Sequence, residues 1–266
     1  ETSLTIEGVR TVIDSGLVRR SGWDPYRGMD TLHLTKISKA SAAQRAGRAG
    51  RVAPGRCFRL WSEAEQARKA DFDPPECFRV DLAGAVLNLA AWGITAPEGF
   101  RWLDAPDPLV MQRAVNLLAA LGATEADGSL TDVGRRMTAF PLPPRLARLM
   151  AAGQDEQCVV ELAAIAALMQ GEGVAMKGGL NDNLRDSADY TDFQAEWRAV
   201  EKAVDAGFEA GACTRWGISA RGAREVWMAY RQLLSIGSRG KSREMPEPDF
   251  TAARPAVVRA MMESFA

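Results

Sequence analysis

A short segment rich in arginine and glycine, QRAGRAGR from Gln44 to Arg51, has the residue types and the spacing of an anion-binding site. On a helix, Gln44, Arg48 and Arg51 would project from one face, because separations of four and seven residues leave side chains within roughly 40° of one another. Guanidinium groups bind phosphate oxygens through paired, charge-assisted hydrogen bonds, and a glutamine amide can orient a water molecule. The spacing therefore predicts a polyphosphate clamp for a transferred γ-phosphoryl group.

The two glycines of the segment, Gly47 and Gly50, are predicted to form a second, bare face that a ligand or another backbone can approach. Each glycine inside a helix costs about 0.5–1 kcal/mol relative to alanine. Arg45 would point about 100° away from Gln44. A solvated basic helix is the simpler alternative. A glycine-rich phosphate loop is not the explanation, because the sequence contains no GxxxxGK[ST] motif.

The elements that must position this segment are predicted to form an incomplete α/β layer. A helix over residues 39–52 is expected to end at Pro54-Gly55. Runs of β-branched and apolar residues predict three strands, at 9–14, 30–35 and 56–61. So few strands do not complete an α/β layer, and the sequence therefore indicates a fragment or a processed piece of a larger protein.

From residue 76 onward the chain is predicted to be mostly helical. Two helices, 76–92 and 107–121, precede an Asp127-Gly128 turn and indicate a winged-helix unit, with an ordinary helix pair and loop as the alternative. Apolar periodicity from residue 143 indicates a helix bundle. Its predicted helices are 144–152, 157–170, 188–206, 220–236 and 254–264.

The composition is that of a globular protein with an uneven distribution of charge. The net charge is −1, but residues 1–60 carry eleven basic and five acidic side chains, so an anion-binding surface is expected at that end. The sequence has no run of about 18 apolar residues, and no membrane span is predicted. The sequence has one histidine and four scattered cysteines: His33, Cys57, Cys77, Cys158 and Cys213. Their spacing does not predict a metal site, and it indicates that the cysteines are reduced cytoplasmic thiols.

The segment at 44–51 resembles motif VI of the DEAH/DExH group of superfamily 2 helicases, and ETSLTIEGVRTVIDSG at 1–16 resembles the latter part of their motif V and the following strand. The runs FRLWSEAEQ, LAAWG and LTDVGRRMTAFPLPPRLARLM resemble the bacterial HrpB-type branch of this group. The likeness is strong over residues 1–152 and weaker to the end. It implies an α/β partial RecA-like domain followed by mostly α winged-helix and helical-bundle (ratchet) domains, divided at 1–62, 63–142 and 143–266.

The resemblance also implies roles for individual residues. Arg48 and Arg51 match the arginine fingers of the family, which contact the nucleotide phosphates, and Gln44 matches the glutamine near the γ-phosphate and the attacking water. Glu7 lies where relatives often have an aspartate that binds the ribose. Thr2 and Ser3 match positions that couple RNA contact to the ATP site. Arg45 is assigned a structural role, in which it would hold the helix to neighbouring loops.

The function implied by the resemblance is that of an ATP-dependent RNA helicase moving 3′ to 5′ along single-stranded nucleic acid, expected to be RNA, with ATP and Mg²⁺ as cofactors. The phosphate-binding lysine motif and the acidic box of the family belong to a first RecA-like domain, which is absent from this sequence. The chain alone is therefore expected neither to hydrolyse ATP nor to unwind RNA. The alternatives are a non-catalytic nucleic-acid-binding or protein-interaction module and a winged-helix regulator, although the latter fits only residues 76–140.

Overall fold

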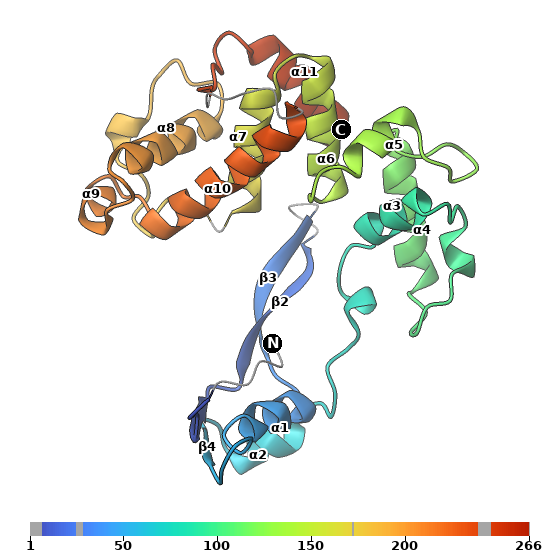
Figure 1. Ribbon diagram of the computed structural model, residues 1–266, viewed down its shortest axis with the longest axis vertical. Coiled ribbons are helices and arrows are strands. Elements are labelled where there is room, and N and C mark those ends of the chain that lie inside the picture. Colours follow the sequence, from blue (N-terminus) through green and yellow to red (C-terminus); the bar gives the residue numbers. More distant parts are fainter. Residues whose placement is uncertain (1–6, 25–28, 172, 239–245, 266) are drawn as a thin grey trace. The chain divides into compact units, whose positions relative to one another are not determined.

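The computed structural model describes residues 7–24, 29–171, 173–238 and 246–265 (Figure 1). The chain forms two compact units, the first made of Glu1–Leu82 and Glu98–Gln112 and the second of Ala83–Pro97 and Arg113–Ala266. The division into three domains remains a prediction. None of the described helices is both long and apolar enough to cross a lipid bilayer.

A small parallel sheet forms the base of the first unit. Strand β1 (Thr11–Asp14) pairs with β4 (Arg56–Arg59), with Thr11 opposite Arg56. Helix α1 (Lys39–Gly47) lies between these strands in the chain and contacts β1. The predicted strands at 9–14 and 56–61 are thus confirmed, although both are shorter than expected.

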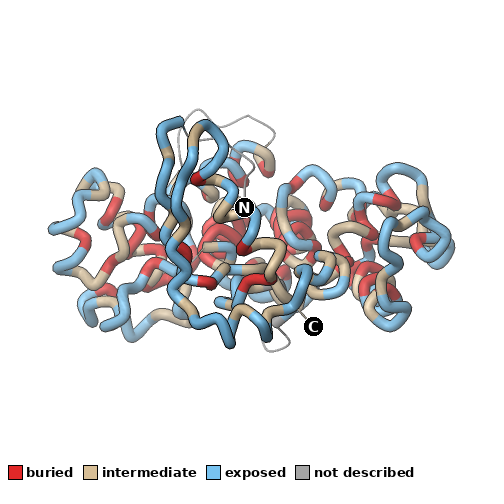
Figure 2. The backbone as a smooth tube through the Cα atoms, turned by 90° about the horizontal axis from the view of Figure 1, so that it is seen from below, coloured by how far each residue is buried: buried red, intermediate tan, exposed pale blue. Residues whose placement is uncertain are grey.

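A long antiparallel hairpin is inserted between β1 and α1. Strand β2 (Leu17–Asp24) pairs with β3 (Met29–Lys36), and Figure 1 shows the two strands extending away from α1 and α2 (Glu63–Arg68). Most of their described residues are exposed or half-buried (Figure 2). The strand at 30–35 was expected, but β2 was not, because it contains Gly22, a poor strand former, and only one β-branched residue, Val18. Pairing with β3 outweighs that local preference.

Helix α1 is shorter than the predicted helix over 39–52. After Gly47 the backbone N–H groups of Ala49 and Gly50 donate to the carbonyls three residues earlier, at 3.1 and 3.3 Å, so the chain leaves the α-helix through tight turns. The following turn passes close to this end, because a Cβ atom at Gly55 would lie only 2.1 Å from the Ala49 carbonyl oxygen. Glycine at position 55 therefore allows the close approach that ends the helix early.

The region between α2 and α6 (Pro144–Asp155) matches the expected winged-helix order only in outline. The predicted helix over 76–92 is a 3₁₀ turn (Glu76–Phe78) and a separate helix, α3 (Ala83–Ala91). The break follows from Arg79, whose carbonyl accepts a hydrogen bond from Trp23 N–H at 2.9 Å rather than one from a continuing helix. The elements that follow are a 3₁₀ turn (Pro97–Gly99), α4 (Pro108–Ala120), an antiparallel bridge between Thr124 and Leu130, and α5 (Asp132–Met137).

A bundle of helices makes up the rest of the second unit. Helix α7 lies at its centre, because eight consecutive residues from Glu161 to Leu168 are buried and the helix contacts α6, α8 and α10. Trp197 of α8 and Tyr230 of α10 pack edge to face, with ring centroids 4.6 Å apart. The elements are α6 (Pro144–Asp155), α7 (Val159–Gln170), a 3₁₀ turn (Asp182–Leu184), α8 (Asp192–Asp205), α9 (Ala210–Arg215), α10 (Ala220–Gly237) and α11 (Arg254–Phe265).

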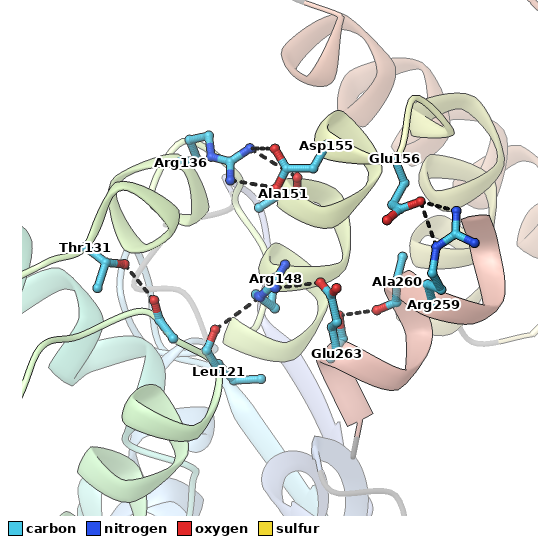
Figure 3. A network of polar contacts seen from close by, with 12 residues as sticks. Leu121, Thr131, Arg136, Arg148, Ala151, Asp155, Glu156, Arg259, Ala260 and Glu263 are labelled. Carbon is cyan, nitrogen blue, oxygen red and sulfur yellow. Dashed lines mark hydrogen bonds and ion pairs between the residues drawn. The ribbon is translucent and has the colours of Figure 1, made fainter. Parts of the chain in front are cut away.

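Ion pairs join α6 to its neighbours α5 and α11 (Figure 3). Arg136 of α5 donates to both carboxylate oxygens of Asp155, at 2.7 and 2.9 Å. The pairs between α6 and α11 are Arg148 with Glu263, at 2.6 Å, and Glu156 with Arg259. Charged side chains therefore fix the rim of the bundle, whereas apolar burial holds its centre.

Candidate functional site

The orientation of α1 on the sheet is set by a buried ion pair. Asp14, at the end of β1, is only 3% exposed, and its Oδ1 accepts a hydrogen bond from Arg45 Nη1 at 2.8 Å. The same nitrogen donates to the Leu17 carbonyl oxygen at 3.0 Å. Because a buried carboxylate is stable only with its partner in place, this pair fixes the rotation of α1 about its axis. The structural role predicted for Arg45 is confirmed.

Two of the predicted phosphate-binding residues lie one helical turn apart at the C-terminal end of α1. Gln44 is exposed, and Arg48, the residue that caps the helix, is half-buried and keeps a helical backbone (φ −67°, ψ −33°). A separation of four residues places their side chains on neighbouring positions of one face. On the helix these two side chains are rotated by about 60–100° from Arg45, which is turned inward to Asp14.

The expectation that Arg51 shares this helical face is wrong. Arg51 lies beyond the end of α1, in a bend over residues 51–53, and is exposed. The seven-residue relationship to Gln44 requires a continuous helix, and the helix ends at Gly47. The contribution of Arg51 to a phosphate site therefore depends on the path of this bend and not on helical periodicity.

The bare glycine surface is present, but at the end of α1 and not along it. A Cβ atom at Gly47 would meet no described atom within 4 Å, and one at Gly50 would meet only the Gly47 carbonyl oxygen, at 4.0 Å. Gly47 is the last residue of α1 and Gly50 lies beyond it, so the expected helix penalty at two interior positions is wrong. The surface beside Arg48 is thus free of side chains over both positions.

The other candidate residues precede β1. Glu7 is exposed in a turn over residues 7–8, and Gly8 takes a positive φ of 77° there. Thr2 and Ser3 lie outside the described residues. Of the six candidate residues, the structure therefore brings Gln44 and Arg48 together and places Glu7 and Arg51 in separate turns of the same unit.

A residue that the sequence did not single out, Asp73, holds the other end of α1. Its Oδ1 accepts a hydrogen bond from Ser38 N–H at 3.2 Å, and its Oδ2 accepts one from the Ser41 hydroxyl at 2.7 Å. Arg20 of β2 pairs with Oδ1 at 2.5 Å. Burial alone would raise the pKa of Asp73, but the hydrogen bonds from Ser41, Arg20 and Ser38 outweigh it and hold the pKa below its usual value.

The available donors fit a polyphosphate and not a metal ion. Gln44, Arg48 and Arg51 provide an amide and two guanidinium groups, the groups that bind phosphate oxygens. Within the described ranges, no three histidine, cysteine, aspartate or glutamate side chains lie close enough together to hold a metal ion. This end of α1 can therefore neutralise phosphate charge, while an accompanying Mg²⁺ would need carboxylates from elsewhere.

Comparisons with known proteins identify relatives of the chain. The family model for the helicase-associated domain (HA2), winged-helix, matches residues 114–142. The pre-mRNA-splicing factor ATP-dependent RNA helicase prp22 of Schizosaccharomyces pombe is 41% identical over 170 residues, which are 64% of this chain and 15% of that protein.

Solved structures extend the similarity over nearly the whole chain. A crystal structure of the Escherichia coli DExH-box NTPase HrpB matches with a TM-score of 0.61 at 28% identity, and one of the E. coli DEAH/RHA helicase HrpB matches with a TM-score of 0.63 at 26% identity. Each covers 99% of this chain, whereas the chain covers only 27% and 28% of those structures.

These matches agree with one another. The winged-helix match falls on α4, α5 and the turn between them, and both HrpB structures are of helicases or NTPases of the DEAH/DExH type. The chain spans 15–28% of the length of these relatives. Together the matches support the assignment of this chain to the C-terminal, HA2-containing region of a DEAH/DExH helicase.

Proposed function

We propose that this chain supplies the arginine side of the ATP phosphate site of an RNA helicase. The observation that carries the proposal is the end of α1, where Gln44 and Arg48 lie one helical turn apart beside a surface without side chains at Gly47 and Gly50. A solvated basic helix has no need for this bare surface. A phosphate group that approaches the backbone closely does.

The chemistry assigned to these residues is electrostatic. Arg48 and Arg51 neutralise the negative charge that develops on the transferred γ-phosphoryl group, and Gln44 orients the attacking water. Arg45, fixed on Asp14, prevents α1 from rotating away from the phosphates. A domain with a phosphate-binding lysine motif and an acidic box would hold Mg²⁺ with ATP, and the ion would supply further positive charge against the phosphates.

The remaining roles belong to the same proposal. Glu7 binds the nucleotide ribose, and Thr2 and Ser3 couple RNA contact to ATP binding. Closure of two RecA-like domains around ATP, followed by their opening after hydrolysis, moves the protein 3′ to 5′ along single-stranded RNA in the cytoplasm. The winged helix and the ratchet-like bundle, residues 63–142 and 143–266, complete the RNA channel. The relative prp22, named an ATP-dependent RNA helicase, supports RNA as the substrate.

The test is to change Arg51 and Arg48 separately to alanine in a helicase polypeptide that contains this chain. Arg56→Ala is the matched control, because Arg56 is an exposed arginine on β4 of the same unit. Replacement of Arg48 or of Arg51 should lower RNA-stimulated ATP turnover about a thousandfold, which is the scale of the effect of arginine fingers. Binding of RNA without nucleotide should stay within about twofold, because such binding depends on contacts to the RNA backbone.

A different result separates the alternatives. Turnover that survives Arg51→Ala and Arg48→Ala at the level of Arg56→Ala would refute the phosphate-clamp assignment. Wild-type polypeptide that binds RNA without any ATP turnover would favour the non-catalytic binding module.

A further inference from the structure

The segment that follows α2, residues 70–80 and here called the connector, folds back onto the start of α1. The carbonyl oxygens of Ala70 and Asp71 accept hydrogen bonds from the N–H groups of Lys39 and Ala40, at 2.8 and 3.0 Å. The first N–H groups of a helix have no partner within the helix itself. The connector therefore completes the first turn of α1 with its own backbone.

The same connector also contacts the hairpin. The Arg79 carbonyl oxygen accepts a hydrogen bond from Trp23 N–H at 2.9 Å, and the Arg79 guanidinium donates to the Ser21 carbonyl oxygen. Both contacts lie along the free edge of β2, since its other edge pairs with β3. One segment of chain thus touches both α1 and the hairpin.

Between these two points, Asp73 makes both connections with one side chain. Its carboxylate accepts from Ser38 and Ser41 at the start of α1 and pairs with Arg20 of β2 at 2.5 Å. The side chains of Asp73 and Arg20 are 32% and 18% exposed, so water screens this ion pair less than it screens a surface pair. The carboxylate is therefore a direct polar bridge from α1 to the middle of β2.

Two other links between α1, α2 and the hairpin reach only its base. Arg45 donates to the carbonyl of Leu17, the first residue of β2. Lys36, the last residue of β3, pairs with Glu65 of α2 at 3.1 Å, but the two side chains are 70% and 46% exposed. An exposed pair of this kind contributes little rigidity. The Asp73 bridge reaches further along the hairpin than either link.

We propose that Asp73 is a positioning residue that couples α1 to the hairpin β2–β3, so that displacement of the phosphate-facing end of α1 is transmitted to the hairpin. The inference rests on the proposed function, because α1 carries Gln44 and Arg48. In a helicase this coupling makes hairpin movement depend on the state of the ATP site. Loss of the bridge then uncouples ATP turnover from strand unwinding without removing any group that contacts ATP.

The first test measures the bridge itself in the 266-residue chain by hydrogen–deuterium exchange. Asp73→Asn keeps the shape of the side chain and removes its charge. Exchange should become about fivefold faster both in the first turn of α1 and along β2, the change that loss of one hydrogen bond produces. Asp71→Asn is the matched control, because Asp71 pairs with Lys39 at 2.9 Å and is 75% exposed. An increase confined to α1, or equal increases in both variants, would refute the bridge.

The second test asks whether the bridge couples two activities in the helicase polypeptide. Asp73→Asn should keep RNA-stimulated ATP turnover within about twofold and lower the base pairs unwound per ATP about tenfold, within the usual range of coupling between sites. Arg20→Gln should reproduce the defect, and the double variant should be no worse than either single variant. Additive defects, or a parallel loss of turnover and unwinding, would refute the coupling role. Absence of turnover in the wild type would refute the proposed function, whereas the exchange measurement decides the bridge independently.

Discussion

At the scale of single residues, arginines close together in the sequence have different roles because their surroundings differ. Arg45 pairs with the buried carboxylate of Asp14 and is structural. Arg48, three residues later, lies at the helix end beside the bare surface of Gly47. The side chain of Arg45 is 18% exposed and that of Asp14 is 1% exposed. The pair therefore resists solvent competition that would separate exposed partners.

Replacement of Arg45 by alanine should destabilise the first unit by about 3 kcal/mol, because it leaves the Asp14 carboxylate buried without its cation. The measurement is the free energy of unfolding in urea, followed by hydrogen exchange of the amides of β1 and β4. Arg68→Ala, at the exposed end of α2, should change that free energy by less than about 0.5 kcal/mol. Equal stability of the two variants would contradict the structural role of Arg45.

Replacement of Gly47 by alanine should separate stability from function. A Cβ atom there meets no described atom within 4 Å, so the fold should tolerate it and gain about 0.5 kcal/mol through a less flexible unfolded chain. ATP turnover of the helicase polypeptide should nevertheless fall, because the added methyl group occupies the surface assigned to phosphate. Gly84→Ala in α3, where the nearest atom is 4.0 Å away, is the matched control. Unchanged turnover in Gly47→Ala would argue against a ligand at this surface.

Only part of the site was predictable from sequence. The spacing of Gln44 and Arg48 identified one helical face, because four residues are close to one turn. The bridge from Asp73 to Arg20 was not predictable, since the two residues are brought together by the fold and neither belongs to a motif. The position of Arg51 depended on where α1 ends, and residue spacing alone does not reveal the close approach of Gly55 to Ala49 that accompanies this end.

At the scale of elements, apolar periodicity predicted the long helices of the bundle well. Helices α7 and α10 begin and end within two residues of the predicted ranges 157–170 and 220–236. The short helices α5 and α9, of six residues each, were missed. Six residues span fewer than two helical turns, so periodicity gives no usable signal, and caps from Thr131 and Glu209 stabilise these helices instead.

The ion pair between Arg136 of α5 and Asp155 of α6 should make the second unit less stable at acidic pH than at neutral pH. Hydrogen bonds from Arg136 lower the pKa of Asp155 more than burial raises it. The pair therefore stabilises fully above the unfolded pKa of an aspartate, about 3.9, and loses its effect as pH falls through the lower folded value. Because the Asp155 side chain is 57% exposed, the contribution should be at most about 1 kcal/mol.

The measurement is the free energy of unfolding between about pH 6 and pH 2 for the wild type and Asp155→Asn. The difference in the free energy of unfolding between the two proteins should be constant at the upper end of this pH range and should shrink toward zero as the pH falls. Glu125→Gln, in the exposed turn after α4, should follow the wild type throughout. A difference that stays constant across the whole range would show that the charge of Asp155 does not matter.

At the scale of the whole molecule, the cysteines report on the two units separately. Cys57 and Cys77 are half-buried in the first unit, and Cys158 and Cys213 are buried in the second. Burial, with smaller contributions from Glu161 and Glu156, raises the pKa of Cys158 to about 11. At pH 8 its reactive thiolate is therefore scarce as well as shielded.

Alkylation at pH 8, followed by mass spectrometry, should modify Cys57 and Cys77 first. Cys158 should react only at urea concentrations that unfold the second unit, because unfolding both exposes the thiol and restores an ordinary pKa. The urea dependence of each cysteine then gives the stability of its own unit. Modification of Cys158 in native buffer as fast as Cys57 would contradict the burial of α7 and its preceding turn.

The central claim at this scale is that the chain holds one side of an ATP phosphate site and needs a second domain to complete it. The most direct measurement is RNA-stimulated ATP turnover by the pure 266-residue chain and by a joined polypeptide that contains it within a complete second RecA-like domain, together with a domain that has the phosphate-binding lysine motif and the acidic box. We predict no turnover by the chain alone and RNA-stimulated turnover by the joined polypeptide. Turnover by the pure chain, or none by the joined polypeptide, would contradict the claim.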